Sequence, residues 1–445
     1  MDRPFPRQRI AVIGAGVSGL SCAWALSRDH DVVLYEAERR LGGHANTSEV
    51  AWGGGTIAVD TGFIVYNEPT YPNLTALFAH IGIATAPTDM SFSVSLDRGA
   101  YEYAGKDLRG LFAQPSNMLR VRFWSMMRDL LRFYREAPRD LSTLGDQSLG
   151  DYLARNAYGE AFLRDHLYPM AGAIWSMPAD EVCTFPAAAF IRFFENHGLL
   201  KLAKRPTWRT VVGGSRAYVR RLVESIPQIR AGAPVRRVRR QGDGVEVQDA
   251  RGADRFDQVV IAVHPDAALA MLDAPIEAER RLLGAFRYAP NVAWLHSDPS
   301  LMPRRKPAWA AWNYLAEGNG GGALAVSYWM NLLQPLGPAP ELFVTLNPPR
   351  PPRGDLVHAQ ETYRHPQFDG VAMAAQKELW SLQGADRLWY CGAYFGSGFH
   401  EDGLQAGLAV AEQLGGATRP WRVDNESGRI FVTPAALPAR ELAST

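Results

Sequence analysis

Three glycines near the start of the chain have the spacing of a turn that can hold a phosphate. Gly14, Gly16 and Gly19 lie in the stretch "IAVIGAGVSGL" as a G-x-G-x-x-G motif. The first glycine permits a tight turn, the second lets the backbone approach a pyrophosphate, and the third lets a helix pack closely on a strand. A helix that begins with Val17 and Ser18 would offer its free N–H groups and positive dipole end to the phosphates.

The elements around these glycines are predicted in the order that such a site needs. Residues 10–13 and 32–35 are short apolar runs that predict strands, and residues 16–29 between them predict a helix. Glu36 ends the second strand, where an acid accepts hydrogen bonds from ribose hydroxyl groups. This order predicts a bound dinucleotide. The alternative is a glycine turn that serves packing alone.

A second glycine pair distinguishes FAD from NAD, because an FAD site must support a longer molecule. The stretch "EAERRLGGHANT", with Gly42 and Gly43, resembles the second glycine motif of the flavin-containing amine oxidase superfamily, which includes phytoene-desaturase-like enzymes and protoporphyrinogen oxidases. The resemblance implies that this pair passes the ribityl and phosphate region of FAD. His44 stands where the family usually has Arg, which removes a permanent cation. Asp60 and Gly62 match the family's D-x-G position.

The stretch "RLWYCGAYFGSGFHEDGLQAGLAVAEQL" is similar to the last flavin motif of the same family, a strand, a glycine loop and a small-residue helix. We expect the helix to start near Gly403 and to point its N-terminus at the pyrimidine edge of the flavin, where it would stabilise negative charge. The family often has an acid after the strand glycine, but Ala393 follows Gly392 here. Glu401 and Asp402 are the candidates for the missing carboxylate, alongside a backbone group. The alternative is a glycine-rich surface loop before an ordinary helix.

A third stretch, "APVRRV…VEVQD…FDQVVIAV", resembles the family's segment that flanks the adenine, and it makes Val235 a backbone-contact candidate. The resemblance therefore implies FAD as the cofactor. The candidate cofactor-binding residues are Gly14, Gly16, Val17, Ser18, Gly19, Glu36, Ala37, Gly42, Gly43, His44, Val235, Gly392, Asp402, Gly403 and Leu404. His400 and Glu401 are the catalytic candidates. Cys391 and His400 are candidates for covalent flavin attachment, although a packed cysteine and a hydrogen-bonded histidine are the preferred interpretation.

The fold predicted from these motifs is α/β, with a doubly wound, Rossmann-like FAD-binding domain and a discontinuous, mixed α+β substrate domain. The FAD-binding domain would comprise residues 1–70, 205–287 and 385–418, and the substrate domain residues 71–204 and 288–384. Most of residues 71–204 are expected to be helical. Four strands are expected at 291–298, 308–315, 324–330 and 341–346. Residues 419–445 are expected to form a proline-containing tail.

Composition excludes several other classes of protein. The net charge of +1 gives no global basic field for nucleic acid. The three cysteines form no CxxC pair, which argues against a disulfide scaffold and against a zinc or iron–sulfur site, and no metal is expected. No signal peptide and no membrane-spanning run are evident, so we expect a cytoplasmic protein, either free or peripheral on the inner face of the membrane.

No second nucleotide motif is present, because the glycines of "GNGGGALAV" precede a strand and predict a hairpin loop. The flavin would therefore take electrons from a substrate and pass them to oxygen, a quinone or another protein. The helix over residues 117–136 combines many apolar residues with five arginines. It is either a core helix or an interfacial helix that meets an anionic membrane surface. The predicted substrate sheet carries an aromatic set suited to an apolar ligand, namely Trp294, Trp309, Trp312, Tyr328 and Trp329.

Amine oxidases of the family commonly place a Lys near the flavin, and the corresponding stretch "YAPNVAWLHSD" has none. The "GGHANT" motif resembles a bacterial branch associated with enzymes that modify acyl chains of phospholipids. On that resemblance the favoured function is hydride removal from an apolar substrate to form a C=C bond, as in a fatty-acyl desaturase or dehydrogenase. One alternative is oxidation of an amine or another small molecule. Another is a flavin-free binding protein of the GDP-dissociation-inhibitor type.

Overall fold

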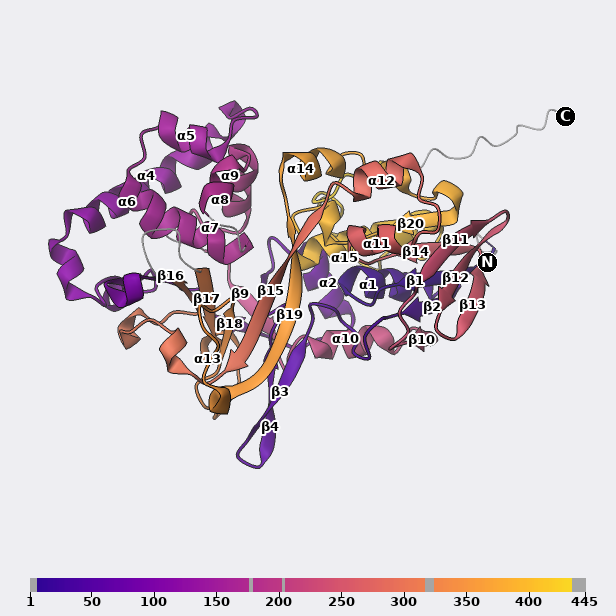
Figure 1. Ribbon diagram of the computed structural model, residues 1–445, viewed down its shortest axis with the longest axis horizontal. Coiled ribbons are helices and arrows are strands. Elements are labelled where there is room, and N and C mark those ends of the chain that lie inside the picture. The colour runs from indigo at the N-terminus through magenta and orange to yellow at the C-terminus, as the bar shows by residue number, and fades with distance from the viewer. Residues whose placement is uncertain (1–5, 176–178, 202–204, 317–323, 434–445) are drawn as a thin grey trace. The chain divides into compact units, whose positions relative to one another are not determined.

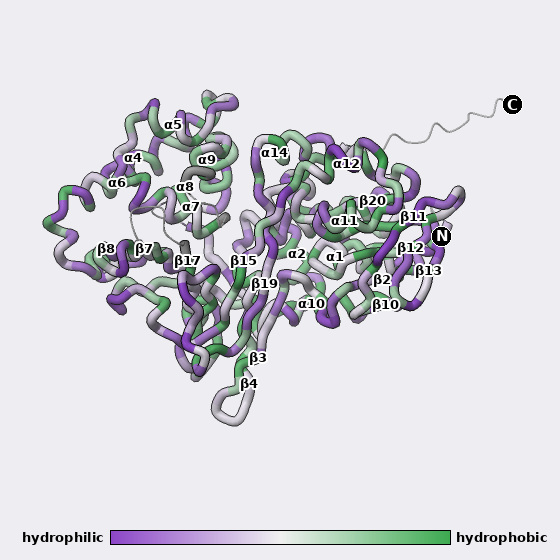
Figure 2. The backbone as a smooth tube through the Cα atoms, in the orientation of Figure 1, coloured by the Kyte–Doolittle hydropathy of each residue, from purple (hydrophilic) through white to green (hydrophobic). Residues whose placement is uncertain are grey.

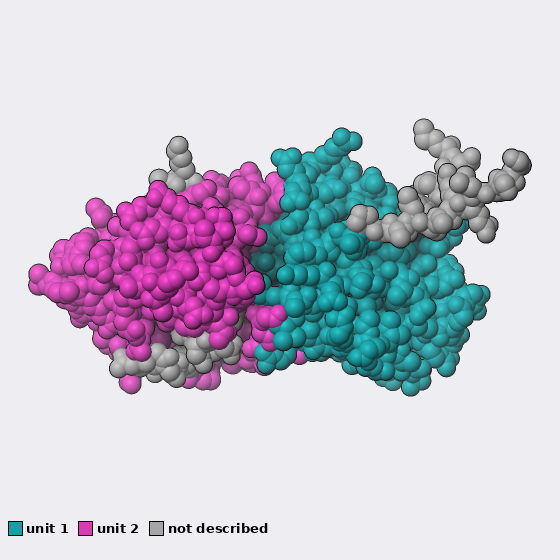
Figure 3. All heavy atoms as spheres, turned by 90° about the horizontal axis from the view of Figure 1, so that it is seen from above, with its two compact units in different colours: residues 1–43, 219–287, 371–445 teal, residues 44–218, 288–370 magenta. Residues whose placement is uncertain are grey.

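The computed structural model describes residues 6–175, 179–201, 205–316 and 324–433. The chain folds into two compact units, each built from separated segments (Figure 3). Unit 1 comprises residues 1–43, 219–287 and 371–445, and unit 2 comprises residues 44–218 and 288–370. The predicted domain limits differ from these at every boundary except the one after residue 287, and they stay a prediction.

Unit 1 contains a parallel five-stranded sheet in the order β10-β2-β1-β14-β20 (Figure 1). The strands are β10 (Gln228–Arg230), β2 (Asp31–Tyr35), β1 (Arg9–Ile13), β14 (Gln258–Ile261) and β20 (Leu388–Tyr390). The central strands β1, β2 and β14 are almost continuously apolar and buried, as is typical of parallel sheets (Figure 2). The α/β class and the predicted strands of the N-terminal motif are confirmed. Strand β1 lies between β2 and β14, and the carboxyl end of such a strand is where doubly wound sheets bind ligands.

Helix α1 (Val17–Leu26) follows β1 and is buried along its whole length. Helix α15 (His400–Leu414) packs beside it, and Gly403 and Gly407 allow the close approach. A Cβ atom on Gly407 would collide with the backbone oxygen of Ser18. The start predicted near Gly403 was wrong by three residues, because the side chain of Asp402 accepts a hydrogen bond from the Phe399 N–H at 2.7 Å and so extends the helix to His400.

An antiparallel sheet of three strands completes the middle segment of unit 1, with β11 (Arg237–Gln241), β12 (Gly244–Asp249) and β13 (Gly252–Phe256). The first two strands form a hairpin, with Gln241 opposite Gly244. The left-handed φ of +49° at Gly242 suits glycine in that tight turn. Helices α11 (Pro265–Met271), α12 (Glu277–Leu283) and α14 (Gly370–Gln376) follow later along the chain.

Unit 2 contains a mixed seven-stranded sheet in the order β19-β15-β18-β17-β16-β7-β8. The strands are β19 (Val357–Gln367), β15 (Arg287–His296), β18 (Phe343–Leu346), β17 (Leu324–Trp329), β16 (Trp312–Ala316), β7 (Phe92–Leu96) and β8 (Tyr101–Ala104). Four of them correspond to the strands predicted between residues 291 and 346. The glycines of the predicted hairpin loop lie within 317–323, outside the described residues. Strands β7 and β8 lie in the region expected to be mostly helical.

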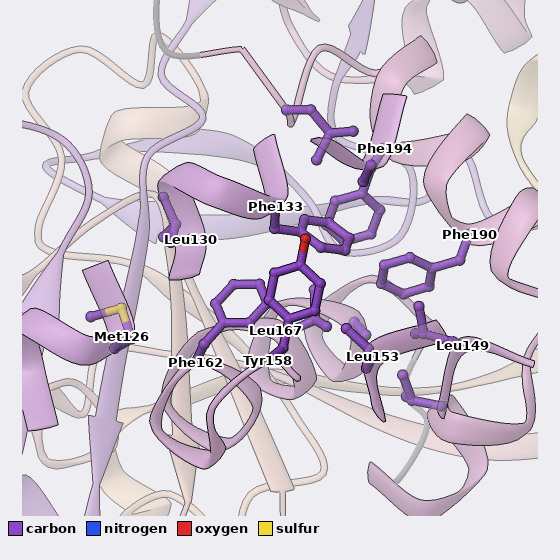
Figure 4. Packing of buried hydrophobic residues seen from close by; sticks show 14 of the residues in the cluster. Met126, Leu130, Phe133, Leu149, Leu153, Tyr158, Phe162, Leu167, Phe190 and Phe194 are labelled. Atoms are coloured by element: carbon purple, nitrogen blue, oxygen red, sulfur yellow. The ribbon is translucent and has the colours of Figure 1, made fainter. Parts of the chain in front are cut away.

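The helical part of unit 2 packs around a large apolar core (Figure 4). Its helices are α4 (Val121–Asp140), α5 (Leu149–Arg155), α6 (Glu160–Phe162), α7 (Tyr168–Trp175), α8 (Ala179–Thr184) and α9 (Ala187–Asn196). Helix α4 starts four residues later than predicted, after a 3-10 turn over Pro115–Leu119. It turns Phe123, Met126, Leu130 and Phe133 into the core. This face of α4 therefore serves packing within the protein.

Among the described residues, no helix combines the length and the apolar character that crossing a membrane requires. Within the same part of the chain, no group of three or more histidine, cysteine, aspartate or glutamate side chains is arranged to hold a metal ion.

Candidate dinucleotide-binding site

The first glycine turn has the geometry that its motif predicts. Gly14 has a left-handed φ of +103°, and its N–H donates to the carbonyl oxygen of Tyr35 at 2.8 Å. A Cβ on Gly19 would collide with the carbonyl oxygen of Gly14, so only glycine allows α1 to begin so close to the turn. A Cβ on Gly16, in contrast, would meet nothing within 4 Å. The open space beside Gly16 leaves its backbone free to approach a ligand.

Glu36 braces this turn from the end of β2. One carboxylate oxygen accepts the Ala15 N–H at 2.7 Å, and the other accepts the Glu38 N–H at 2.9 Å. Each oxygen of a carboxylate has two acceptor sites, so each retains one for a ribose hydroxyl group. Glu36 is half-buried, which keeps those sites within reach of a ligand.

The segment before β11 lies beside Glu36. The Ala233 N–H donates to the Glu36 carbonyl oxygen at 2.8 Å, and the Gly232 N–H donates to that of Glu38. Val235 follows two residues later and is half-exposed. The structure thus brings the segment of the adenine candidate next to the acid, as the resemblance implies. Ala37 is the intervening residue in the same turn.

The second glycine pair abuts the first turn. Gly42 and Gly43 have positive φ values of +116° and +56°. The Gly42 N–H donates to the Ala15 carbonyl oxygen at 2.8 Å, and a Cβ on Gly43 would lie 3.1 Å from the Cα of Gly16. The turn over residues 14–19 and the loop of Gly42 and Gly43 therefore form one continuous backbone surface.

The N-termini of α1 and α15 converge at this surface. A Cβ on Gly403 would lie 2.8 Å from both Ser18 Oγ and Val17 Cγ1, so the first turns of the two helices touch. Leu404 is buried in the same turn. Two positive helix ends in one place favour a negatively charged ligand. Gly392, at the end of β20, leaves no room for a side chain because a Cβ there would collide with the Tyr394 ring.

The acidic residues at the start of α15 are fully buried and already bonded. Asp402 accepts from Arg429 Nε at 2.5 Å and from Arg429 Nη2 at 3.3 Å, besides the Phe399 N–H. Glu401 accepts from Gln405 Nε2 at 2.9 Å. Burial lowers the pKa of His400 to about 3, so its imidazole is neutral at pH 7. The pairing of Asp402 with Arg429 was missed, because Arg429 lies in the segment expected to be only a tail.

Cys391 is a core residue in this structure. It is fully buried, and it lies beside Cys22 on α1. Burial, reinforced by the hydrogen bond with Cys391, raises the pKa of Cys22. The buried contact between the two cysteines favours packing over covalent attachment for Cys391.

Within unit 2, His44 belongs to an aromatic and polar cluster that sequence reasoning missed. Its ring centroid lies 5.0 Å from that of Tyr363 and 5.6 Å from that of His365, both on β19. The Tyr363 hydroxyl group bonds Asn46 Nδ2 at 2.9 Å and Thr61 Oγ1 at 2.7 Å. Burial lowers the pKa of His365. The alternation of Tyr and His on one strand face was the available signal.

The D-x-G residues support this cluster. A Cβ on Gly62 would collide with the His44 carbonyl oxygen, and that oxygen accepts the Phe63 N–H at 2.7 Å. The Asp60 carboxylate accepts from the N–H of Ser215 at 2.9 Å and from Gln334 Nε2 at 2.9 Å. Asp60 therefore holds together three distant segments of unit 2.

The aromatic residues predicted to line the substrate sheet mainly pack on each other. Trp309 contacts Trp329 with ring centroids 5.3 Å apart, and Trp312 contacts Tyr328 at 4.8 Å. Trp309 also donates its Nε1–H to the Pro303 carbonyl oxygen. Trp294 is half-buried on β15. Core packing accounts for the buried Trp309 and Tyr328, whereas the half-buried Trp294, Trp312 and Trp329 are compatible with a ligand.

The residues of unit 1 fit FAD. The open space at Gly16 and the two helix ends suit a pyrophosphate, and the remaining acceptor sites of Glu36 suit a ribose. The paired glycine loops provide a backbone surface for the part of the molecule that extends beyond the pyrophosphate.

Replacing Glu36 by alanine is expected to weaken FAD binding by about 1.5–3 kcal/mol, the usual contribution of hydrogen bonds to a charged group. The loss combines the ribose contacts with the brace on the Ala15 N–H. Titration of the purified apoprotein with FAD measures it, and Glu38→Ala is the matched control because the Glu38 side chain is exposed. An unchanged FAD affinity in Glu36→Ala would contradict the assignment.

Comparison with known proteins gives a consistent result. Residues 17–300 match the family model of flavin containing amine oxidoreductase. A putative flavin-containing monoamine oxidase, AofH of Mycobacterium tuberculosis, is 27% identical over 289 residues, which cover 62% of this chain. The match spans 61% of the length of AofH.

Solved structures show the same fold at low sequence identity. Putrescine oxidase gives a TM-score of 0.64 at 15% identity, with 92% of this chain and 99% of that chain covered. Cyclohexylamine oxidase from Brevibacterium oxydans gives 0.62 at 17% identity, with 92% and 100% covered. A fatty acid isomerase from P. acnes that produces CLA gives 0.65 at 15% identity, with 92% and 98% covered.

Proposed function

Because the chain belongs to the flavin containing amine oxidoreductase family, we propose that this FAD-dependent oxidoreductase oxidises a small amine. The observation that carries the proposal is the 27% identity to a monoamine oxidase over 289 residues. Bound FAD supplies a hydride acceptor. The hydride would come from the carbon bonded to nitrogen, which converts the amine to an imine. This is the alternative function from the sequence, and the family match supports it better than acyl desaturation.

The chain's own residues would bind the cofactor and manage charge and protons. The N-termini of α1 and α15 favour negative charge where they converge. An amine must lose its ammonium proton before hydride can leave, because its lone pair has to be available. His365 would accept and pass on that proton, because burial lowers the pKa of its imidazole, which favours an unprotonated ring nitrogen and a weakly held proton. The imidazole of His44, 5.6 Å away between ring centroids, is a second acceptor in the same cluster.

A second candidate is removal of hydride from a fatty-acyl chain to form a C=C bond. One observation favours it: none of the seven strands of the unit 2 sheet carries Lys, the residue that amine oxidases of the family commonly use near the flavin. An acyl substrate would imply a lipid partner and a position on the inner face of the membrane. The family match favours either enzyme over the flavin-free binding protein. The electron acceptor would be oxygen, a quinone or another protein.

Anaerobic mixing of the purified yellow protein with a substrate panel tests the proposal. Aliphatic monoamines, diamines and a cyclic amine form one arm, and free fatty acids and phospholipid vesicles form the other. We expect an amine to bleach the flavin absorbance within one turnover, and re-admitted oxygen to restore it. Bleaching by acyl chains alone would replace the proposal by the second candidate, and a protein that binds no flavin would overturn both.

A further inference from the structure

Five large apolar side chains gather on the surface of unit 2 where α4 begins. We call them the apolar tip: Leu108 is 74% exposed, Met118 49%, Leu119 89%, Val121 84% and Trp124 51%. They come from the short helix α3 (Leu108–Leu111), the 3-10 turn over residues 115–119 and the first turn of α4. The other large apolar side chains described as exposed lie singly along the chain, so this concentration is unusual.

Contacts between the three elements make the tip continuous. The Trp124 ring lies 6.2 Å from that of Phe112, and Trp124 Nε1 donates to the Met118 carbonyl oxygen at 2.9 Å. The Phe112 N–H in turn bonds the Leu108 carbonyl oxygen at 3.1 Å. The backbone of the three elements is therefore fixed, while their large side chains face solvent.

Packing within the unit does not account for these side chains. Helix α4 already fills the core with a separate set of residues on its opposite face, such as Phe123, Met126 and Phe133. Leu119 and Val121 project on either side of Arg120 and are almost fully exposed. Exposing them to water is unfavourable, so something other than the unit's own fold must account for them.

The charges around the tip are mostly positive. Lys106, Arg109 and Arg120 lie within it, and the neighbouring acid, Asp107, uses its carboxylate to accept the Gly110 N–H. The arginines farther along the helix are already paired. Arg122 bonds the buried carboxylate of Asp165 through two nitrogens. At the start of the helix, Lys106 donates to the Trp309 carbonyl oxygen and Arg120 to the Ala100 carbonyl oxygen. These acceptors are neutral, so the positive charge there is not cancelled by an ion pair, whereas that of Arg122 is.

The same holds for the next two arginines of α4. Arg128 and Arg132 both lie within ion-pair distance of the buried Asp129, at 3.1 and 3.7 Å. Charge reversal at Arg128 and Arg132 would therefore destabilise the fold, and it could not show whether this helix contacts a partner. Variants of the apolar tip provide the test instead.

We propose that the apolar tip inserts into the interface of an anionic lipid bilayer. Large apolar side chains enter the acyl boundary while interleaved basic groups remain at the headgroups, which is the pattern of interfacial binding. A second copy of the chain is a less favourable partner for the tip, because it would bring Lys106, Arg109 and Arg120 close to the same residues of the other copy, and like charges repel. Charge complementarity therefore favours an anionic bilayer. The inference does not depend on whether an amine or an acyl chain is oxidised.

Co-sedimentation of the FAD-loaded protein with vesicles tests this directly. Wild type is expected to bind phosphatidylglycerol-containing vesicles at low salt, and less at high salt because salt screens the basic groups. Binding to purely zwitterionic vesicles is expected to be weaker. The double variant Leu119→Ser/Val121→Ser should lower partitioning at least tenfold. Arg109→Ala/Arg120→Ala should lower it on anionic vesicles and remove most of its salt dependence.

The matched control is Val371→Ser, which removes an apolar side chain that is 66% exposed in unit 1. It should bind vesicles like wild type, and all variants should retain their flavin absorbance. The proposal is overturned if wild type ignores anionic vesicles at low salt, or if the tip variant binds as well as the control. A tip variant that converts a dimer to a monomer without changing vesicle binding would instead assign the tip to a second copy.

Discussion

Replacing Gly19 by alanine is expected to leave a protein that no longer retains FAD through purification. The new Cβ would collide with the carbonyl oxygen of Gly14, and neither backbone group can move without opening the turn. Overpacking of this kind costs about 3 kcal/mol. If this cost falls on the FAD-bound form, in which the Gly14 turn must be closed, FAD binds roughly 100-fold more weakly. FAD titration and the thermal unfolding midpoint of the apoprotein measure the two effects.

Two further glycines serve as controls for this variant. In Gly16→Ala the new Cβ meets no protein atom within 4 Å, so the apoprotein should unfold at the wild-type temperature. The same Cβ would occupy the space proposed for the pyrophosphate, so FAD binding should weaken. Gly354→Ala also meets nothing and has an ordinary φ, so it should change neither quantity. Equal FAD affinity in Gly19→Ala and wild type would show that FAD binding does not require the close approach of α1 to the Gly14 turn.

Replacing Arg429 by alanine is expected to destabilise unit 1 by about 3 kcal/mol, because it leaves a fully buried Asp402 carboxylate without its cation. The start of α15 should loosen and FAD should dissociate faster. Chemical denaturation and the rate of flavin release measure these effects. The double variant Arg429→Ala/Asp402→Asn should recover part of the stability, since its buried side chain is uncharged.

The exposed Arg422 in the same segment provides the matched control, and Arg422→Ala should behave like wild type. If Arg429→Ala unfolds at the wild-type denaturant concentration, the ion pair contributes nothing. If the double variant is no more stable than the single one, the damage does not come from the unpaired carboxylate.

Local patterns in the sequence were sufficient for the parts of the site that are close together in the chain. The glycine turn, α1 and Glu36 lie within residues 10–36, and each is dictated by backbone sterics or by a strand end. The Gly42–Gly43 pair could be placed because its positive φ angles demand glycine.

Interactions between distant segments could not be predicted in this way. Arg429 is separated from Asp402 by the rest of helix α15 and then by an irregular segment after Leu414, so nothing local signals their pairing. Strand β7 pairs locally with β8, but its other partner, β16, begins at Trp312, more than 200 residues later, so its place inside the sheet could not be inferred from the local sequence. The start of α15 depends on one hydrogen bond, which the Phe399 N–H donates to the Asp402 carboxylate and which places the start three residues before Gly403.

The arrangement of unit 1 also has a consequence for how the protein is made. The glycine turn emerges from the ribosome first, but the edge strand β20, the helix α15 and Arg429 belong to the last segment. At about 5–20 residues per second, roughly 20–80 s separate the synthesis of Gly19 from that of Arg429. Between the synthesis of β14 and that of β20, the edge of β14 that faces away from β1 is unpaired, and this open edge is a hazard for aggregation. FAD would then be loaded only after the segment that carries Arg429 has been synthesised, and coexpressed chaperones together with ample riboflavin should raise the yield of yellow protein.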